Sequence, residues 1–224
     1  MPLHSGNGSN NWAVAAEKSN TGHPILASDP HLALTLPSIW YEVQLHFPGV
    51  NARGVSLPGA PGIMIGFNDH IAYGETNVGH DVTDWFKIEW TDTTRTKYHL
   101  DSTVVSAHVI TDTLFIKGRA PEVLHTPWTI FGPVPHTKGR YANHAMRYLG
   151  HDAPGKSVRP HALAGAFLAL TAARNYDDFV DALRGYIDPA QNFLFADRAG
   201  DIAIRPNGGF PLRAPGQTGR YPTS

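Results

Sequence analysis

The chain has 224 residues, 42% hydrophobic and 17% charged, which is typical of a globular protein large enough to bury its own core. Its formal net charge of -1 and the lack of a Lys/Arg cluster argue against a nucleic-acid partner, because phosphate binding requires concentrated positive charge. The absence of cysteine excludes disulfides and thiolate catalysis, and no apolar run approaches the roughly 20 residues of a membrane span.

The first part of the chain predicts a leader followed by short strands. Residues 1–8 are expected to be a leader or the end of a spacer peptide. Residues 12–28 alternate like a β-hairpin whose turn is Asn20-Thr21-Gly22, and Asp29-Pro30-His31 is expected to end that pattern. Further strands are predicted at residues 38–47, 54–57, 63–66 and 71–74.

The rest of the chain predicts antiparallel strands, then two helices, then strands again. Residues 82–116 and 128–148 are rich in Thr, Val and aromatic residues. Residues 161–174 predict a helix, and Asn175 is a candidate N-cap for a second helix through Leu183. Strand patterns return at 192–196 and 202–204. We therefore expect an α+β protein, with residues 9–224 forming one partial domain.

The thirteen histidines do not predict a zinc site. No two of them are two to four positions apart, which is the spacing at which imidazoles share one face of a strand or helix. A zinc site built from histidines is therefore not expected.

Ser9 is the candidate nucleophile, at the junction between the leader and the first strand. A serine hydroxyl needs a base, and the α-amino group of a serine at the chain terminus can act as one. That amine has a pKa of about 7.7 to 8.0, so part of it is neutral near physiological pH. This chemistry requires cleavage of the Gly8-Ser9 bond. The alternative interpretation is an ordinary Gly-Ser-Asn loop.

Several motifs in a fixed order resemble the start of the β chain of the penicillin acylase family, which belongs to the N-terminal nucleophile hydrolases. The resemblance implies a four-layer αββα fold, incomplete in this chain. It rests on Gly8-Ser9-Asn10-Asn11-Trp12, Asp29-Pro30-His31-Leu32, Pro61-Gly62 through Gly66-Phe67-Asn68, Gly74-Glu75-Thr76-Asn77-Val78-Gly79, and Gln191-Asn192-Phe193 through Gly200-Asp201-Ile202.

The resemblance implies a role for each residue of the site. Ser9 matches the nucleophile that becomes terminal after self-cleavage, and His31 matches a residue that holds its amine and hydroxyl. Asn77 matches the residue whose backbone N–H stabilises the oxyanion. Leu32 and Ile65 match the acyl pocket. The alternatives are a turn-capping role for His31, a loop role for Asn77, and plain core positions for Leu32 and Ile65.

The resemblance also implies a structural calcium site, with no cofactor for the chemistry. Its ligands would be the carboxylates of Asp81 and Asp84 and the backbone carbonyls of Thr83 and Pro211, since calcium prefers oxygen ligands. The alternative is that the two aspartates belong to a solvated loop.

These observations predict an amide hydrolase that removes the acyl group from a β-lactam, an acyl-homoserine lactone or a similar small-molecule amide. The family's α chain, the second oxyanion donor and the rest of the β chain have no counterpart here, so they are expected partners. The alternative functions are an inactive fragment and a calcium-stabilised binding module. The N-terminus lacks a secretory signal pattern, so only the resemblance suggests a periplasmic or secreted location.

Overall fold

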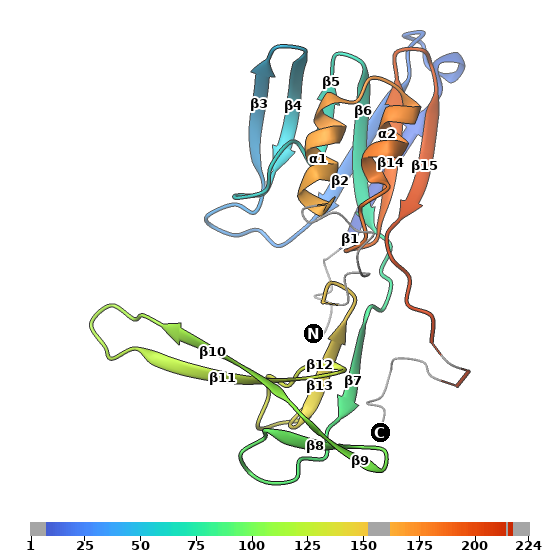
Figure 1. Cartoon of the computed structure of the whole chain (residues 1–224). Coiled ribbons are helices and arrows are strands. Elements are labelled where there is room, and N and C mark those ends of the chain that lie inside the picture. Colours follow the sequence, from blue (N-terminus) through green and yellow to red (C-terminus); the bar gives the residue numbers. More distant parts are fainter. Residues whose placement is uncertain (1–7, 152–161, 214, 217–224) are drawn as a thin grey trace. The chain divides into compact units, whose positions relative to one another are not determined.

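A computed structural model describes residues 8–151, 162–213 and 215–216 (Figure 1). Strands dominate it, and its two α-helices are α1 (Ala162–Ala172) and α2 (Tyr176–Leu183). The α+β expectation is thus confirmed. The chain divides into two compact units: the first comprises residues 1–80 and 154–210, and the second residues 81–153 and 211–224. The single partial domain over residues 9–224 stays a prediction.

A six-stranded antiparallel sheet organises the first unit, in the order β15-β14-β6-β5-β4-β3 (Figure 1). In β3–β4 the connecting turn is Pro48-Gly49, and Gly49 has a φ of 82°, which glycine adopts without steric cost. The strands are β3 (Tyr41–Phe47), β4 (Val50–Ser56), β5 (Ile65–Asn68), β6 (Ile71–Asn77), β14 (Gln191–Asp197) and β15 (Ile202–Asn207).

The predicted N-terminal hairpin forms, with different bounds. Its strands are β1 (Gly8–Val14) and β2 (Ile25–His31), and a short 3-10 helix (Ala16–Lys18) lies in the loop. Strand β1 therefore begins four residues before the predicted start at Trp12. The predicted break at Asp29-Pro30-His31 is wrong, because these residues belong to β2. A proline lacks the backbone N–H of a ladder bond, and this two-stranded sheet has only edge strands, where proline is tolerated.

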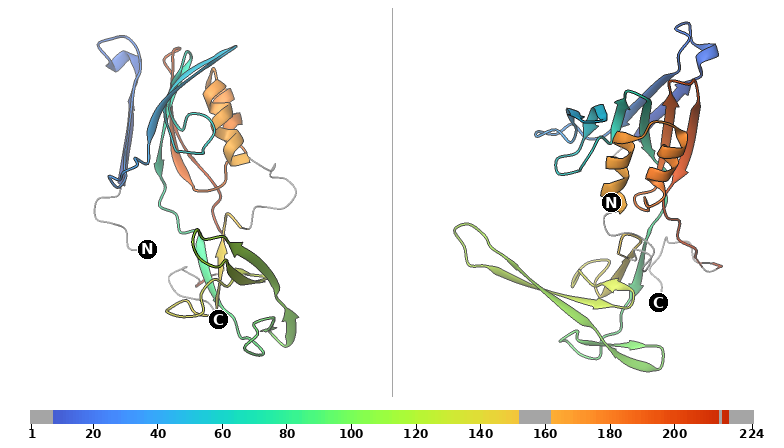
Figure 2. Two further views of the ribbon diagram at one scale, coloured as in Figure 1. Left: turned by 90° about the vertical axis from the view of Figure 1, so that its left-hand side faces the viewer. Right: turned by 45° about the horizontal axis from the view of Figure 1, so that its top comes forward.

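The helices cover one face of the six-stranded sheet and the hairpin lies on the other (Figure 2). Alternation along β6 explains this layering. Tyr73 points into the core beneath the helices, where its hydroxyl donates a 3.0 Å hydrogen bond to the carbonyl of Ile63. The next residue, Gly74, faces the hairpin, and a Cβ built on it would lie 2.5 Å from the Cβ of Ser28.

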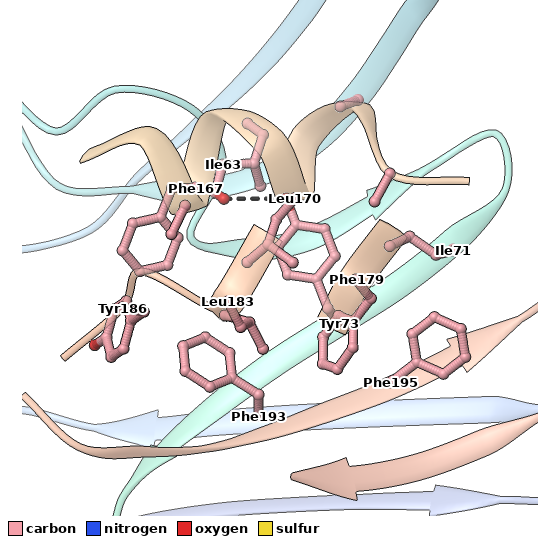
Figure 3. Packing of buried hydrophobic residues seen from close by; sticks show 13 residues of the cluster. Ile63, Ile71, Tyr73, Phe167, Leu170, Phe179, Leu183, Tyr186, Phe193 and Phe195 are labelled. Carbon is pink, nitrogen blue, oxygen red and sulfur yellow. Dashed lines mark hydrogen bonds between the residues drawn. The ribbon is translucent and has the colours of Figure 1, made fainter. Parts of the chain in front are cut away.

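The core beneath the helices consists of aromatic and aliphatic side chains from helices and sheet (Figure 3). Both predicted helices form, and Asn175 caps α2 by accepting a 2.9 Å hydrogen bond from the backbone N–H of Asp178. The large buried side chains of this core are Ile63, Ile71, Tyr73, Phe167, Leu170, Phe179, Leu183, Tyr186, Phe193 and Phe195. No helix in the described part of the chain is long and apolar enough to cross a membrane.

The second unit consists of small antiparallel sheets, as the pattern over residues 82–116 and 128–148 predicts. Strand β13 pairs with β7, β8 with β9, and β11 with both β10 and β12. Its own core contains Ile88, Tyr98, Val134 and Ala145. The strands are β7 (Thr83–Lys87), β8 (Lys97–Leu100), β9 (Thr103–Ser106), β10 (His108–Leu114), β11 (Glu122–Thr129), β12 (Gly132–Pro133) and β13 (His144–Tyr148).

Candidate active site

Ser9 lies at the start of β1, on the side that faces the six-stranded sheet. Burial alternates along this strand: Ser9 and Asn11 are partly buried, whereas Asn10 and Trp12 are exposed. The side-chain amide of Asn11 donates a 3.3 Å hydrogen bond to the carbonyl of Asn192 in β14. The face of β1 that carries Ser9 and Asn11 is therefore the one turned toward the six-stranded sheet. The Ser9 hydroxyl donates a 2.5 Å hydrogen bond to the carbonyl of Gly8. It therefore lies against the peptide bond that self-cleavage would break.

The strand register places His31 opposite Gly8, on the outer face of the hairpin, whereas the Ser9 side chain points to the other face. His31 pairs with Gly8 and Pro30 pairs with Ser9, and the imidazole Nδ1 lies 3.8 Å from the position that a Cβ on Gly8 would take. The imidazole Nε2 is 2.8 Å from Oδ2 of Asp29. Sequence reasoning assigned no role to Asp29. The available signal is its spacing, because two residues apart in a strand point to the same face.

Asn77 ends β6 opposite Gln191, the first residue of β14. Its side-chain Oδ1 accepts a 2.8 Å hydrogen bond from Nε2 of Gln191. The backbone N–H of Val78 donates to the carbonyl of Ala190 at 3.2 Å, which extends the pairing beyond the strand. The end of β6 is thus held in place by both side-chain and backbone bonds.

Ser9 and Asn77 lie at the same end of the first unit. At the other end, Leu26 of the hairpin lines a cavity of about 590 Å³ together with Ile71 and Ala72 from the start of β6. Since Leu26 pairs with Ala13, the end of β1 lies near the start of β6. The start of β1 therefore lies toward the end of β6, so Ser9 and Asn77 share this end of the unit, whereas the His31 side chain is on the outer face of the hairpin.

The two predicted acyl-pocket residues differ in exposure. Leu32 directly follows β2 and is 39% exposed. Ile65 begins β5, and its Cγ2 lies 3.8 Å from the position of a Cβ on Gly74, so its side chain is on the hairpin face of the sheet. The acyl-pocket role of both residues stays a prediction.

Glu75 is a second residue to which sequence reasoning gave no role. It lies in β6 two residues before Asn77, so both side chains point to the face that the helices cover. Glu75 is 8% exposed, and in the described part of the chain its Oε2 has no hydrogen-bond partner. Burial raises the pKa of Glu75 to about 8. A carboxyl group within a largely apolar strand was the signal available in the sequence.

The predicted calcium ligands lie in the second unit, around an arginine. Asp81, Thr83 and Asp84 are at or just before the start of β7, and Pro211 lines a cavity of about 310 Å³ together with Asp84 and Arg213. Arg213 Nε donates to both carboxylate oxygens of Asp84, at 3.1 Å each. The backbone N–H of Thr83 donates a 3.3 Å hydrogen bond to Oδ1 of Asp81. The carboxylate of Asp84 is therefore already paired with a cation.

The fold resembles that of a solved penicillin acylase. The match to thermostable penicillin G acylase from Alcaligenes faecalis has a TM-score of 0.80 and 22% sequence identity, and it covers 95% of this chain and 38% of that chain. The sequence profile of the family described as penicillin amidase matches residues 2–224. The chain therefore belongs to the penicillin amidase family, as the ordered motifs predicted.

Curated relatives share the family and are much longer. Acyl-homoserine lactone acylase QuiP from Pseudomonas aeruginosa is 32% identical over 229 residues, which is 95% of this chain and 27% of that protein. Acyl-homoserine lactone acylase PvdQ from Pseudomonas fluorescens is 28% identical over 86% of this chain and 25% of that protein. Penicillin acylase 2 proenzyme from a Pseudomonas species is 36% identical over 41% of this chain and 12% of that protein. The chain thus spans about a quarter of the length of the acyl-homoserine lactone acylases that it matches.

Proposed function

We propose that this chain is the nucleophile-bearing part of an acylase that hydrolyses an amide through Ser9. The family assignment supports an amidase, and the placement of Ser9 carries the proposal. Its hydroxyl lies 2.5 Å from the Gly8 carbonyl oxygen, on the side of the hairpin that faces the sheet. His31 pairs with Gly8 in the neighbouring strand. Asn77 is the last residue of β6, and the start of β1 lies toward that end of β6.

The first step is self-cleavage between Gly8 and Ser9. The Ser9 Oγ attacks the carbonyl carbon of Gly8, and the hydroxyl proton passes to the Ser9 nitrogen as the bond from that carbon to the nitrogen breaks, so that an ester to Oγ forms. Water then hydrolyses the ester, which gives a carboxylate on Gly8 and a free amine and hydroxyl on Ser9. The hydrogen bond between the hydroxyl and this carbonyl keeps the two reacting groups adjacent.

The second step is acyl transfer from the substrate. The neutral amine of Ser9 takes the hydroxyl proton while Oγ attacks the amide carbon, and the amine then delivers that proton to the leaving nitrogen. The backbone N–H of Asn77 donates to the oxyanion of the tetrahedral intermediate. Water then hydrolyses the resulting ester: the amine takes a proton from the attacking water and returns it to Oγ as the acid leaves. The contact between His31 and Asp29 fixes the imidazole beside Gly8, on the face of the hairpin opposite to the Ser9 side chain.

The substrate is an amide with an apolar acyl group, such as an acyl-homoserine lactone or a β-lactam with an acyl side chain. Relatives that carry these activities in their names support this class. Leu32 and Ile65 are proposed to contact the acyl group. We also propose that the longer protein completes a four-layer αββα fold by adding helices over the hairpin. The exposed Trp12, on the outer face of the hairpin, supports such a layer.

The test is to replace Ser9 in the full-length protein. We expect Ser9→Ala to abolish cleavage after Gly8 and to reduce turnover by a factor on the order of 10⁴ to 10⁶. Intact mass of the purified chains reports the cleavage, and hydrolysis of a chromogenic phenylacetyl amide and a long-chain acyl-homoserine lactone reports turnover. Ser9→Cys should retain cleavage because a thiol can also attack the carbonyl.

Ser19→Ala is the matched control, because Ser19 lies in the hairpin loop and its hydroxyl bonds to the nearby Thr21 hydroxyl and backbone N–H. It should be processed and active like the unmodified protein. Normal turnover by Ser9→Ala would contradict the proposal. If the unmodified full-length protein folds but is neither cleaved nor active, the result would instead favour a binding module.

A further inference from the structure

Arg213 occupies the centre of the acidic group that the family resemblance assigns to calcium. Its Nε donates to both carboxylate oxygens of Asp84, at 3.1 Å each, and its Nη2 donates to the backbone carbonyl of Asp81 at 3.0 Å. The same Nη2 is 3.8 Å from Oδ2 of Asp81. One guanidinium thus reaches oxygen atoms of both aspartates that were expected to bind the metal.

The ion pair is shielded from solvent. The side chains of Arg213 and Asp84 are 16% and 22% exposed, so their attraction is screened less than that of a surface pair. Hydrogen bonds between an arginine and a carboxylate are among the strong ones because both partners are charged. A calcium ion would have to displace the guanidinium before it could use this carboxylate.

The local charge also disfavours a second cation. Arg147 lies directly across from Asp84 in the β7–β13 pair and lines the same cavity as Arg213. The two guanidiniums balance the carboxylates of Asp81 and Asp84, so the group carries no net charge. Calcium usually needs six to eight oxygen ligands, several of them anionic. Among the residues that the structure describes, no group of three or more His, Cys, Asp or Glu side chains could hold a metal ion.

We propose that Arg213 is a built-in counter-cation that replaces calcium in this protein. This segment was expected to supply the backbone carbonyl of Pro211 to a calcium ion. It supplies the guanidinium of Arg213 to the aspartates instead. Through it, residues 211–213 are tied to the start of β7, which lies 129 positions earlier in the chain. The second unit therefore keeps this long-range connection without a metal ion.

The test is the melting temperature of the full-length protein in EDTA and in millimolar calcium. The unmodified protein should melt within about 1 °C in both, since a ligand raises the melting temperature only by binding the folded state. A rise of several degrees in calcium would overturn the proposal, and this comparison needs no variant.

Variants of Arg213 test its role directly. Arg213→Ala should lower the melting temperature by several degrees, and Arg213→Lys should lose less because it keeps the charge. Asp84→Ala combined with Arg213→Ala should cost little more than Arg213→Ala alone, because the two side chains act as a pair.

Arg184→Ala is the matched control. Arg184 pairs with Asp181 across one helical turn, and the two side chains are 74% and 66% exposed, so its loss should shift the melting temperature by less than about 1 °C. An unchanged melting temperature for Arg213→Ala would contradict the proposal.

Discussion

Glu75 shows how burial changes the chemistry of a single side chain. Its carboxyl group is 8% exposed, and burial raises its pKa to about 8, so it is largely protonated at neutral pH. Tyr73 lies two residues before it on the same face of β6. Burial also raises the pKa of Tyr73. Its hydrogen bond with Thr171 lowers this pKa, and the nearby Glu75 raises it by a smaller amount. The helix face of β6 thus holds two neutral acids.

Glu75→Gln should change the pH dependence of stability. Because the folded pKa of about 8 lies above the reference value of 4.5, the unfolded chain releases this proton at lower pH than the folded protein does. Glu75 therefore favours folding at low pH, and this advantage is lost as pH rises from about 4.5 to 8, by up to about 1.4 kcal/mol per pH unit. Glutamine lacks this ionisation, so the variant should gain stability relative to the unmodified protein between pH 5 and 8.

Urea unfolding at several pH values between 5 and 9 measures this effect. Glu17→Gln is the control, since Glu17 is exposed in the hairpin loop, and it should keep the slope of the unmodified protein. Identical slopes for Glu75→Gln and the unmodified protein would show that Glu75 ionises at the same pH in both states.

At the scale of elements, local patterns located most strands but could not pair them. The alternation around Trp12 indicated a strand, yet β1 begins at Gly8 among polar residues of low strand propensity. Pairing with β2 and the bond from Asn11 to Asn192 hold that start in place, and both depend on residues distant in the sequence. Likewise, Arg213 was not predicted because its partner Asp84 is 129 positions away.

The candidate site was predicted from short motifs and not from the fold pattern. Ser9, His31 and Asn77 were chosen one at a time from short motifs, and their roles stay predictions. The structure places Ser9 and Asn77 at one end of the first unit, with His31 on the opposite face of the hairpin from Ser9. The contribution of Asp29 and the burial of Glu75 could not be read in the same way. They depend on how β2 pairs with β1 and on what covers β6.

Gly74→Ala should separate the hairpin from the sheet. A Cβ on Gly74 would lie 2.5 Å from the Cβ and 2.6 Å from the Oγ of Ser28, which is closer than side chains tolerate. We expect a loss of about 1–3 kcal/mol in the free energy of unfolding, as for other overpacked sites. Because β1 is paired with β2, the shift should also displace Ser9 and reduce self-cleavage of the full-length protein.

Gly165→Ala is the matched control within α1. A Cβ there meets nothing within 4 Å, so the change should be neutral or stabilise the helix by up to about 1 kcal/mol. Adding Ser28→Gly to Gly74→Ala should restore part of the loss, since it removes the side chain in contact. Equal stability of Gly74→Ala and Gly165→Ala, measured by urea unfolding, would show that the two layers are not closely packed at this point.

At the scale of the whole molecule, this chain corresponds to a minor part of the proteins that it matches. It covers 27% of one acyl-homoserine lactone acylase and 38% of a penicillin G acylase chain. Two large apolar side chains in the loop between β2 and β3, Leu34 and Leu36, are almost fully exposed. Exposed apolar surface of this kind is typical of a surface that another segment covers. We therefore expect the rest of a longer protein to contact the loop between β2 and β3.

The 224-residue chain alone should hydrolyse amides much more slowly than the full-length protein. One oxyanion donor is proposed here, the backbone N–H of Asn77, and loss of a second donor typically costs on the order of 100- to 1,000-fold in rate. An incomplete acyl pocket should cost more, because positioning of the substrate contributes a large part of the rate enhancement. The exposed leucines should also cause self-association of the chain, measurable by light scattering. Both proteins are assayed with the phenylacetyl amide and the acyl-homoserine lactone, with Ser9→Ala as the background. Equal turnover by the two proteins would mean that the chain already holds every group that the reaction needs, and the second donor would then have to lie within residues 1–224.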